Sequence, residues 1–418
     1  MSDSSSSANS CTIRPFDAGD RRAFLSLYEQ VFDRERSAEW FRWRFEESPY
    51  VDHVPIVVAD DGGEIVGCRS FFPLEVRVGG ADRLALQPCD TMVHPDYRGQ
   101  GLFSRMNAAA VDRYTDGDPA FCFNFPNDNA KPGNRKHGWK EIGTFPVYYR
   151  PQDPIGSAAK LTGTEDGNED GNGDGGGRDA SEATRVAGGT DVDVNGDADD
   201  AWLDLETDTD VDLELPFGDA ADDSGVVDAI GNAITSSQEA GDQLLTDSPD
   251  ELAIERFETP PADVLESIHR RAMPDGIHAA RTAEFYRWRF ANPARSYAAY
   301  VATRDGEAVA ALVCSPVDDR LRIVETLPRD VDAESTAIDY LVAATLLDRS
   351  ERNYVTAFGE TLPSPIRYRF YPDTRFPLST LIRPTARTLF ARDLDGGVGI
   401  ESTDASDWAL SRLDLDTA

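Results

Sequence analysis

Four consecutive residues, Arg98-Gly99-Gln100-Gly101, stand directly before a segment with helical periodicity. In that segment, residues 102–114, apolar and small side chains recur three and four positions apart, as they do on one face of a helix. The first amides of a helix have no acceptor inside it, and the helix dipole adds partial positive charge there. Glycine lets those amides approach an anion, and arginine adds a fixed cation. The pattern predicts a turn that holds phosphate; the alternative is an ordinary strand-to-helix turn.

Residues 93–103 read VHPDYRGQGLF. The last six resemble the Arg/Gln-x-x-Gly-x-Gly/Ala signature of the GNAT superfamily, the acetyl-CoA-dependent N-acetyltransferases, and the first five match the family's usual Val-x-Pro-x-Tyr lead-in. The resemblance implies that backbone amides of this turn hold the pyrophosphate of acetyl-CoA. One departure is Phe103, which stands where the family usually has glycine or alanine, so its ring must point away from the phosphates. The cofactor-binding residues expected in the turn are Arg98, Gly99, Gln100, Gly101, Leu102 and Phe103.

The resemblance also implies roles for residues outside the turn. Backbone groups at Met92 and Val93, on the preceding strand, would bind the pantetheine arm and the thioester carbonyl. Asn124 and Asn127 would reach the pantetheine amides, although Asn127 is equally suited to cap the helix that follows it.

Transfer of an acetyl group to an amine also requires a base and an acid. Asp90 is the expected base, since an acid on this strand often serves in the family; a structural role in a cap or a buried pair is its alternative. His94 lies on the same strand face by alternation and is otherwise a turn residue. The family commonly places an acidic tyrosine on the helix after the fifth strand, but residues 129–137 contain none. Tyr148 and Tyr149, on the next strand, are therefore the candidate acids.

The elements expected between residues 11 and 153 follow the order of the GNAT fold, whose sheet splays between its fourth and fifth strands. Strands are predicted at residues 13–17, 55–60, 64–78, 83–93, 120–125 and 144–150. Helices are predicted at residues 20–32, 38–45, 102–114 and 129–137. Pro88 predicts a bulge or an interruption in the fourth strand.

The chain then repeats itself. Residues 282–290, TAEFYRWRF, echo residues 37–45, SAEWFRWRF, and residues 324–326, VET, fall where residues 89–91, CDT, stood. A self-match of this length predicts two copies of one fold. In the second copy residues 327–334, LPRDVDAE, replace the glycine turn, and their acids would repel pyrophosphate. Because this copy keeps Glu325 in the place of Asp90, the comparison favours a shared structural role for that position.

Between the copies the composition changes. Residues 161–250 hold 26 of the 76 acidic residues and only two of the 41 lysines and arginines. So little apolar surface cannot offset the entropy of ordering, which predicts a disordered linker. The expected organisation is a disordered tail at 1–10, a GNAT domain with the acetyl-CoA turn at 11–153, an acidic linker at 154–250, and a second GNAT-like domain without that turn at 251–418. The expected fold class is α/β (α+β), with two mixed-sheet domains.

The net charge of −35 and the presence of only four lysines resemble proteins of salt-loving archaea. At molar salt the Debye length is about 3 Å, so dense carboxylates no longer repel one another. Such a charge argues against nucleic acid as a partner. No run of 18 apolar residues and no signal peptide are found, so no membrane partner is expected. The five cysteines include no Cys-x-x-Cys pair, so the sequence supports neither a metal site nor a disulfide framework. Free cysteines are consistent with the reducing cytoplasm.

Together these patterns predict a cytoplasmic N-acetyltransferase that moves an acetyl group from acetyl-CoA to an amine of a small molecule or peptide. The second copy would pack against the first, closing the acceptor side or supporting a homodimer. Two alternatives stay open. One is a non-catalytic protein that binds coenzyme A, and the other is a transferase of a different acyl group.

Overall fold

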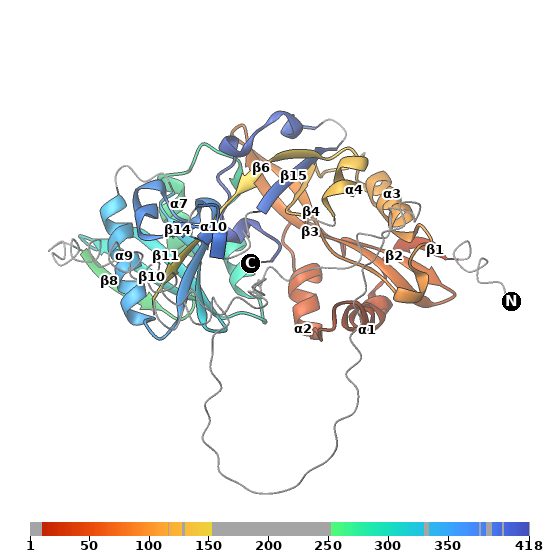
Figure 1. The fold of residues 1–418 in the computed structure, drawn as a ribbon, viewed down its shortest axis with the longest axis horizontal. Coiled ribbons are helices and arrows are strands. Elements are labelled where there is room, and N and C mark those ends of the chain that lie inside the picture. The colour runs from red at the N-terminus through yellow and green to blue at the C-terminus, as the bar shows by residue number, and fades with distance from the viewer. Residues whose placement is uncertain are drawn as a thin grey trace, which may run out of the picture.

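The computed structural model describes residues 11–115, 117–127, 130–152, 252–329, 334–375, 378–381, 387–394 and 397–417. These residues form two mixed β-sheets with helices packed on them, and the sheets lie next to each other (Figure 1). The predicted α/β class with two mixed sheets is confirmed. The predicted tail, residues 1–10, and the predicted linker, residues 154–250, lie outside the described residues.

The first sheet, called sheet A, is built mainly from the first half of the chain. Its strands lie in the order β1-β2-β3-β4-β5-β15-β6, and β9 pairs with β3. Neighbours are antiparallel except β4 and β5, which are parallel. The bounds are β1 Thr12–Pro15, β2 Ile56–Asp61, β3 Glu64–Val78, β4 Ala81–Val93, β5 Phe121–Asn124, β6 Lys140–Phe145, β9 His278–Ala279 and β15 Arg387–Asp393.

The second sheet, called sheet B, has the order β14-β7-β13-β12-β11-β10-β8. Along β8-β10-β11-β12-β13 it repeats the arrangement of β1-β2-β3-β4-β5, with antiparallel neighbours up to a final parallel pair. The two copies predicted from the sequence are thus present as two sheets of one topology. The bounds are β7 Val147–Pro151, β8 Leu252–Phe257, β10 Ala298–Arg304, β11 Glu307–Val317, β12 Arg320–Leu327, β13 Tyr354–Phe358 and β14 Tyr371–Pro372.

The two halves of the chain exchange strands. The single strand predicted at residues 144–150 is divided at Pro146, so that β6 stays in sheet A while β7 pairs with β13 of sheet B. In return β15, from the far end of the sequence, lies between β5 and β6. Strands therefore cross the predicted domain limits, 11–153 and 251–418, in both directions (Figure 1).

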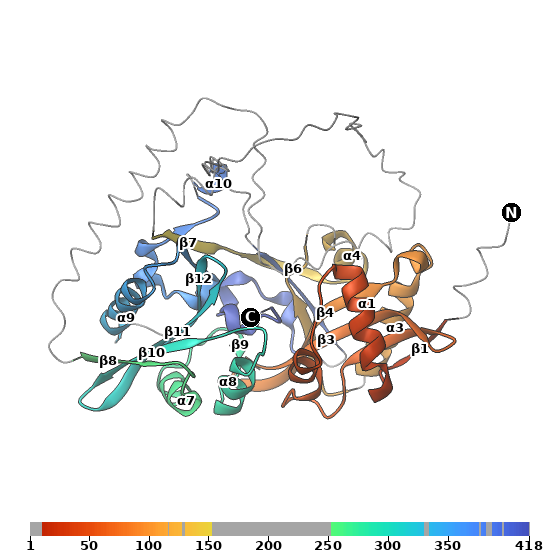
Figure 2. The same ribbon diagram turned by 90° about the horizontal axis from the view of Figure 1, so that it is seen from below.

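Helices cover both faces of each sheet (Figure 2). On β2, Val58 packs in one apolar cluster with Phe24 of α1, whereas its neighbour Val57 packs in another with Leu102 of α3. Because adjacent strand residues point to opposite faces, α1 and α3 lie on opposite sides of sheet A. The cluster around α1 continues through α7 and α8, so the two halves share one core. The helices are α1 Arg21–Phe32, α2 Ala38–Phe41, α3 Leu102–Thr115, α4 Lys131–Lys136, α7 Ala262–Arg271, α8 Ala283–Phe290, α9 Ser335–Asp348 and α10 Leu378–Leu381.

Shorter turns complete the chain. A π-helical turn, Arg42–Glu46, extends α2. The 3₁₀ turns are Ala18–Asp20, Pro95–Tyr97, Gly359–Thr361, Ser364–Arg369, Ile400–Ser402, Ala405–Asp407 and Arg412–Asp414. No helix in the described ranges is long and apolar enough to cross a membrane.

The repeated aromatic motif joins the halves. The Trp43 indole N–H donates to the Trp288 carbonyl at 2.7 Å, and the Trp288 indole N–H donates to the Trp43 carbonyl at 2.9 Å. These tryptophans occupy equivalent positions in the two copies, so the contact is reciprocal. The structure thus shows that the second copy packs against the first, as predicted.

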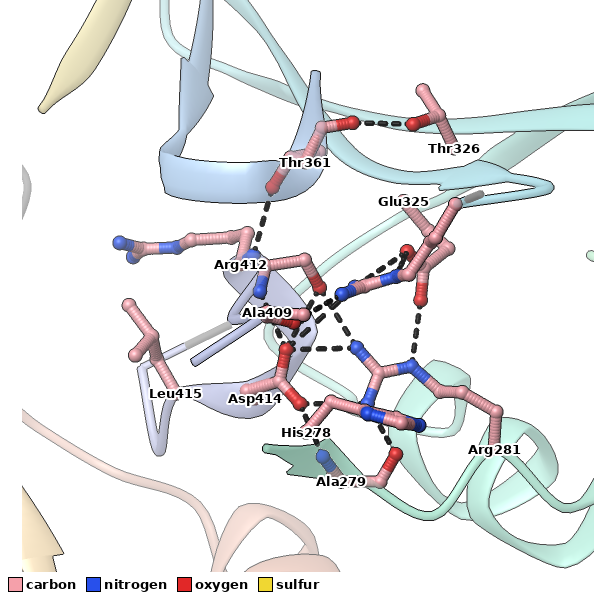
Figure 3. A network of polar contacts seen from close by, with 12 residues as sticks. His278, Ala279, Arg281, Glu325, Thr326, Thr361, Ala409, Arg412, Asp414 and Leu415 are labelled. Atoms are coloured by element: carbon pink, nitrogen blue, oxygen red, sulfur yellow. Dashed lines mark hydrogen bonds and ion pairs between the residues drawn. The ribbon is translucent and has the colours of Figure 1, made fainter. Parts of the chain in front are cut away.

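The C-terminal residues run between the halves and are held from both sides. Gln87 of β4 donates to the Asp414 carbonyl at 2.8 Å, and Arg289 of α8 donates to the Leu415 carbonyl at 2.6 Å. Arg281 lies between the Glu325 and Asp414 carboxylates, at 2.8 and 2.7 Å, and all three side chains are fully buried (Figure 3). Arg329 joins this group with a 2.9 Å ion pair to Glu325. We refer to these four residues as the buried charge cluster.

Candidate active site

The glycine turn connects β4 to α3 through the short 3₁₀ turn Pro95–Tyr97. Gly99 and Gly101 have φ angles of 73° and 70°, a region that favours glycine over other residues. The Arg105 amide donates to the carbonyl of Gly101, the residue directly before α3, at 3.1 Å and so begins the hydrogen-bond ladder of the helix. The amides before it precede the helical ladder. A side chain built at Gly101 would meet nothing within 4 Å, so there is space for a ligand above this turn.

The polar side chains of the turn stabilise its shape. Gln100 donates from Nε2 to the Asp96 carbonyl at 3.1 Å, and Arg98 donates from Nε to the Val93 carbonyl at 3.5 Å. His94 accepts from the Asp96 amide through Nδ1 at 3.2 Å, which is the turn role considered as its alternative. A pyrophosphate group fits this turn, because amide donors, a cation and open space are all present.

Phe103 is buried and its ring is directed back into the protein. The guanidinium carbon of Arg69 lies 5.2 Å from the ring centre, and the His137 ring lies 6.1 Å away. Leu102 is buried in the cluster beneath α3. The side chains of these two residues are therefore buried in the protein and do not fill the space above the turn.

The parallel strands beside the turn separate after a short contact. β4 pairs with β5 only through Ala85–Phe121 and Leu86–Cys122. From residue 87 onward, no strand in the described part of the chain pairs with this edge of β4. Met92 and Val93 lie on the separated part, with their side chains buried on opposite faces. The Val93 carbonyl accepts from Arg98, and the role of both backbones in binding the pantetheine arm stays a prediction.

A β-bulge lies inside this separated part of β4. Cys68 pairs with Met92 while Ser70 pairs with Cys89, so the register shifts by one residue at Asp90, whose φ is +44°. The prediction of a bulge or interruption at Pro88 placed the irregularity two residues too early, because Pro88 itself stays in register with Phe71. Proline is accommodated there because β5 has already separated and left β4 with an open edge.

Asp90 is held in a buried ion pair. Arg44, on the π-helical turn, contacts the Asp90 carboxylate through Nε at 2.5 Å, and the two side chains are 6% and 2% exposed. Arg44 also donates to the Asp416 carbonyl at 2.7 Å. Glu325, the counterpart of Asp90, is likewise held by arginines in the buried charge cluster. Both copies therefore use this position for a buried ion pair, which is the structural role that the repeat favoured.

The remaining predicted site residues lie in two places. Asn124 accepts from Asn134 at 3.1 Å, and Asn127 accepts through Oδ1 from the Ala130 amide at 2.8 Å, so Asn127 caps the turn that leads into α4. Both asparagines face the pocket described next. Tyr148 and Tyr149 lie on β7 of sheet B, where each packs in an apolar cluster, and neither lines that pocket.

A pocket of about 270 Å³ opens beside the bulge. One wall is the bulge with the end of β5 and the start of α4. The facing wall comes from α1, α2 and the loop between them, and a third comes from the second half of the chain. Its lining includes Tyr28, Arg34, Arg36, Trp40, Arg44, Arg69, Asp90, Phe103, Arg295, Arg387 and Asp416.

Of the charged residues of this pocket, only Asp90 was identified from the sequence. The repeat favoured a structural role such as a buried pair for Asp90, but it did not identify Arg44 as the partner. Arg295 is about 200 positions from the glycine turn, and no pattern in its neighbouring residues indicates that it lies in the pocket. The aromatic motif that the chain repeats at residues 37–45 and 282–290 lies partly at the pocket, because Trp40 and Trp43 are buried and also line it.

Comparison with known proteins adds an independent observation. Residues 12–142 match the model of the acetyltransferase (GNAT) domain family. A search of curated proteins found no match.

Solved structures of similar fold include a GCN5-related N-acetyltransferase from Anabaena variabilis, with a TM-score of 0.53 and 10% identity, covering 92% of this chain and 73% of that one. Another, from Kribbella flavida, has a TM-score of 0.51 and 15% identity, covering 94% and 73%. A third, described as a probable N-acyltransferase from Enterococcus faecalis, has a TM-score of 0.52 and 10% identity, covering 92% and 73%. At such identities the likeness shows the fold, and it confirms the GNAT fold expected from the sequence.

Proposed function

We propose, because residues 12–142 match the acetyltransferase (GNAT) domain family, that the protein transfers an acetyl group from acetyl-CoA to a primary amine. The observation that carries the proposal is the turn at residues 98–103. It combines two glycines of positive φ with the amides at the start of α3, next to a separated pair of strands. The corresponding segment of the second copy has none of these glycines, and Glu334 stands before α9 in an ion pair with Arg304. The first copy alone is therefore suited to acetyl-CoA.

In this proposal the amides of the turn and the Arg98 guanidinium bind the pyrophosphate. The pantetheine arm lies in the opening between β4 and β5, where the backbone of Met92 and Val93 meets it, and the thioester reaches the pocket beside the bulge. Asn124 and Asn127 lie at the far edge of that opening. This arrangement holds the reacting carbonyl next to the space for an acceptor.

Transfer then proceeds by direct attack. The neutral amine forms a bond to the acetyl carbon, the carbon–sulfur bond breaks, and the amine proton is lost as the thiolate of coenzyme A gains one. The predicted role of Asp90 as base requires its ion pair with Arg44 to open. The predicted acids, Tyr148 and Tyr149, would have to act from outside the pocket, and both assignments stay predictions. Tyr28 is the one tyrosine among the described residues that line the pocket, and its hydroxyl is 3.4 Å from Nε of Arg36.

Release of free thiol from acetyl-CoA, measured across a panel of amines, tests the proposal. Amine-dependent thiol release with an acetylated product is the expected result. Tight binding of acetyl-CoA without turnover on any amine would instead support a non-catalytic coenzyme A-binding protein. Repeating the assay with succinyl-CoA and longer acyl-CoA thioesters decides which acyl group is preferred.

A further inference from the structure

Two carboxylates, Asp90 and Asp416, line the pocket beside the bulge in the part of the chain that the structure describes. The described lining includes no histidine and no glutamate, the other side chains that most often act as a general base. The Asp90 side chain is 2% exposed and lies 2.5 Å from Nε of Arg44, so it is closed to a ligand while this ion pair persists. The Asp416 side chain is 24% exposed. Asp416 is therefore the carboxylate that an amine in the pocket can reach.

The backbone of Asp416 is held in place by two elements of the first half. Its amide donates to Oε1 of Gln87, on β4, at 3.2 Å, and its carbonyl accepts from Nη1 of Arg44 at 2.7 Å. Gln87 is buried and also donates to the Asp414 carbonyl at 2.8 Å. These bonds fix the segment against the strand that carries the bulge. A carboxylate placed in this way is oriented before a substrate arrives.

The Asp416 carboxylate shares one cation with Asp90. Its Oδ2 lies 3.2 Å from Nη2 of Arg44, whereas Asp90 binds the same guanidinium at 2.5 Å. Among the described residues, no other cation lies within ion-pair distance of either carboxylate. The closer contact favours the ionised form of Asp90, and the longer one leaves Asp416 a greater affinity for a proton.

The surroundings of Asp416 adjust its proton affinity in the direction that a base requires. Burial raises the pKa of the Asp416 carboxyl above its usual value; the charge of Arg44 opposes that rise, and the charge of Asp90 adds to it. The Arg289 guanidinium of α8 also opposes the rise. A base is most effective when its pKa approaches the working pH. The other titratable or charged side chains of the described lining are Tyr28, Arg34, Arg36, Arg69, Cys89, Arg295 and Arg387.

The second half of the molecule supplies an internal comparison. There Glu325 stands at the position of Asp90, and Arg281 lies between it and Asp414, at 2.8 and 2.7 Å. Asp414 is fully buried, and although burial acts to raise its pKa, the Arg281 guanidinium lowers it well below its usual range. Asp416 follows two residues later, is partly exposed, and has a raised pKa. One segment thus holds a carboxylate that stabilises the fold and another that lines a cavity.

We propose that Asp416 is the general base of the acetyl transfer, and that Arg44, itself held by Asp90, positions it. The inference rests on the proposed acetyl transfer and assigns a residue to one of its steps. The Asp416 carboxylate takes a proton from the amine as the nitrogen forms its bond to the acetyl carbon. The carbon–sulfur bond breaks and its electron pair leaves with the sulfur. The thiolate then takes one proton from solvent, and Asp416 releases one to solvent, so that the protons balance.

The kinetics of Asp416→Asn test this assignment. Thiol release from acetyl-CoA is measured with spermidine, glycinamide, glucosamine and a lysine-containing peptide, and the amine that the wild type acetylates fastest is used from pH 6 to pH 9. We expect kcat to fall about 100-fold or more, the effect of a general base, while the KM of acetyl-CoA stays unchanged. The acidic limb of the kcat/KM profile should be present in the wild type and absent from the variant. A kcat close to that of the wild type, or a variant that keeps the limb, would overturn the proposal.

Further variants separate a base from a structural residue. Asp416→Glu keeps a carboxylate and should keep the acidic limb with a smaller loss of kcat. Asp404→Asn is the matched control, since this exposed aspartate belongs to the same C-terminal region, does not line the pocket, and should leave kcat unchanged. The melting temperature of Asp416→Asn should stay within about 4 °C of the wild type, because asparagine still accepts from Arg44. A fall as large as that of Asp90→Asn, measured beside it, would show that Asp416 serves the fold and would refute the assignment.

Urea unfolding of the wild type and Asp416→Asn between pH 4 and pH 7 gives a readout that needs no turnover. A carboxyl whose pKa is raised in the folded protein stabilises the fold below its unfolded pKa, and this stabilisation is lost as the pH rises through the raised value. The wild type should therefore lose stability relative to the variant towards pH 7. A flat or opposite trend would show an ordinary ion pair, which contradicts the proposed base.

The two proposals can fail separately. If the wild type acetylates no amine of the panel although acetyl-CoA binds, the proposed transfer is wrong, and the role of Asp416 falls with it. If the wild type acetylates an amine and Asp416→Asn does so equally well, the transfer stands and only the assignment of the base is wrong.

Discussion

Replacement of Arg281 by methionine should severely destabilise the protein. This guanidinium donates to the Glu325 and Asp414 carboxylates, the Ala279 carbonyl and the Ser411 hydroxyl, and its side chain is fully buried. Methionine fills much of the volume but leaves two buried carboxylates with Arg329 as their one remaining cation in the cluster. Removing one partner from a buried ion pair costs about 3–5 kcal/mol. We expect a loss of that size in the free energy of unfolding at neutral pH.

The same variant should respond to acid in a defined direction. Burial acts to raise the pKa of Asp414, but the charges and hydrogen bonds of Arg281, with Arg329, lower it well below its usual range. In the wild type this carboxylate therefore stabilises the fold at every pH above about 4, the pKa of an aspartate in the unfolded chain. The stabilisation is lost as the pH falls from there through the lowered pKa of Asp414 in the folded protein. Without Arg281, burial dominates and the folded-state pKa rises above that of the unfolded chain. The variant's deficit should then be largest at pH 7 and shrink towards pH 4.

Urea unfolding at fixed salt concentration, monitored by tryptophan fluorescence from pH 7 to pH 4, measures both effects. Arg270→Met is the control, since its side chain is 69% exposed and forms an i,i+4 pair with Glu266. Such a pair contributes less than about 0.5 kcal/mol. A loss below about 1 kcal/mol for Arg281→Met, or a deficit that does not change with pH, would refute the reasoning.

Three further predictions concern the turn, the joint between the halves and the bulge. Arg98→Glu should weaken acetyl-CoA binding at least about 10-fold by calorimetry, because it reverses the charge at the pyrophosphate; unchanged affinity would mean that the turn is misread. Trp43→Phe and Trp288→Phe should each cost about 1–3 kcal/mol in unfolding free energy, since each removes a buried hydrogen bond from an indole N–H to a carbonyl, and a loss below about 0.5 kcal/mol for either would contradict this. Asp90→Asn should lower the melting temperature while the pH–rate profile keeps its shape; loss of the acidic limb at unchanged melting temperature would instead identify Asp90 as a base.

Much of the fold could be predicted because its signals are local. Alternation and helical spacing located most strands and helices of the first copy within a few residues, and the self-match located the second copy. The glycine turn could be recognised because positive φ angles favour glycine, and because the helix that follows shows its spacing in the next residues. The helix predicted at 129–137 was shorter, Lys131–Lys136.

What the sequence could not predict depends on contacts between distant residues. Nothing near residue 390 indicates that β15 pairs with β5 and β6, because strand pairing over more than 240 positions has no local pattern. The division at Pro146 sends two adjacent tyrosines into the other sheet, which no periodicity could reveal. The repeat indicated that Asp90 has a structural role, but it could not identify the partner. That partner, Arg44, lies on a π-helical turn, whereas the matching segment of the second copy, α8, is a regular α-helix.

The exchange of strands has a consequence for how the chain is made. The sheet that carries the glycine turn receives β15, Arg387–Asp393, so it stays incomplete until residue 393 has left the ribosome. A nascent first half would expose the facing edges of β5 and β6, which invite pairing with other chains. A fragment ending near residue 153 should for the same reason aggregate when expressed alone. The second copy lacks the phosphate turn, but it supplies β15 to sheet A. A protein without the second copy would therefore need another strand between β5 and β6.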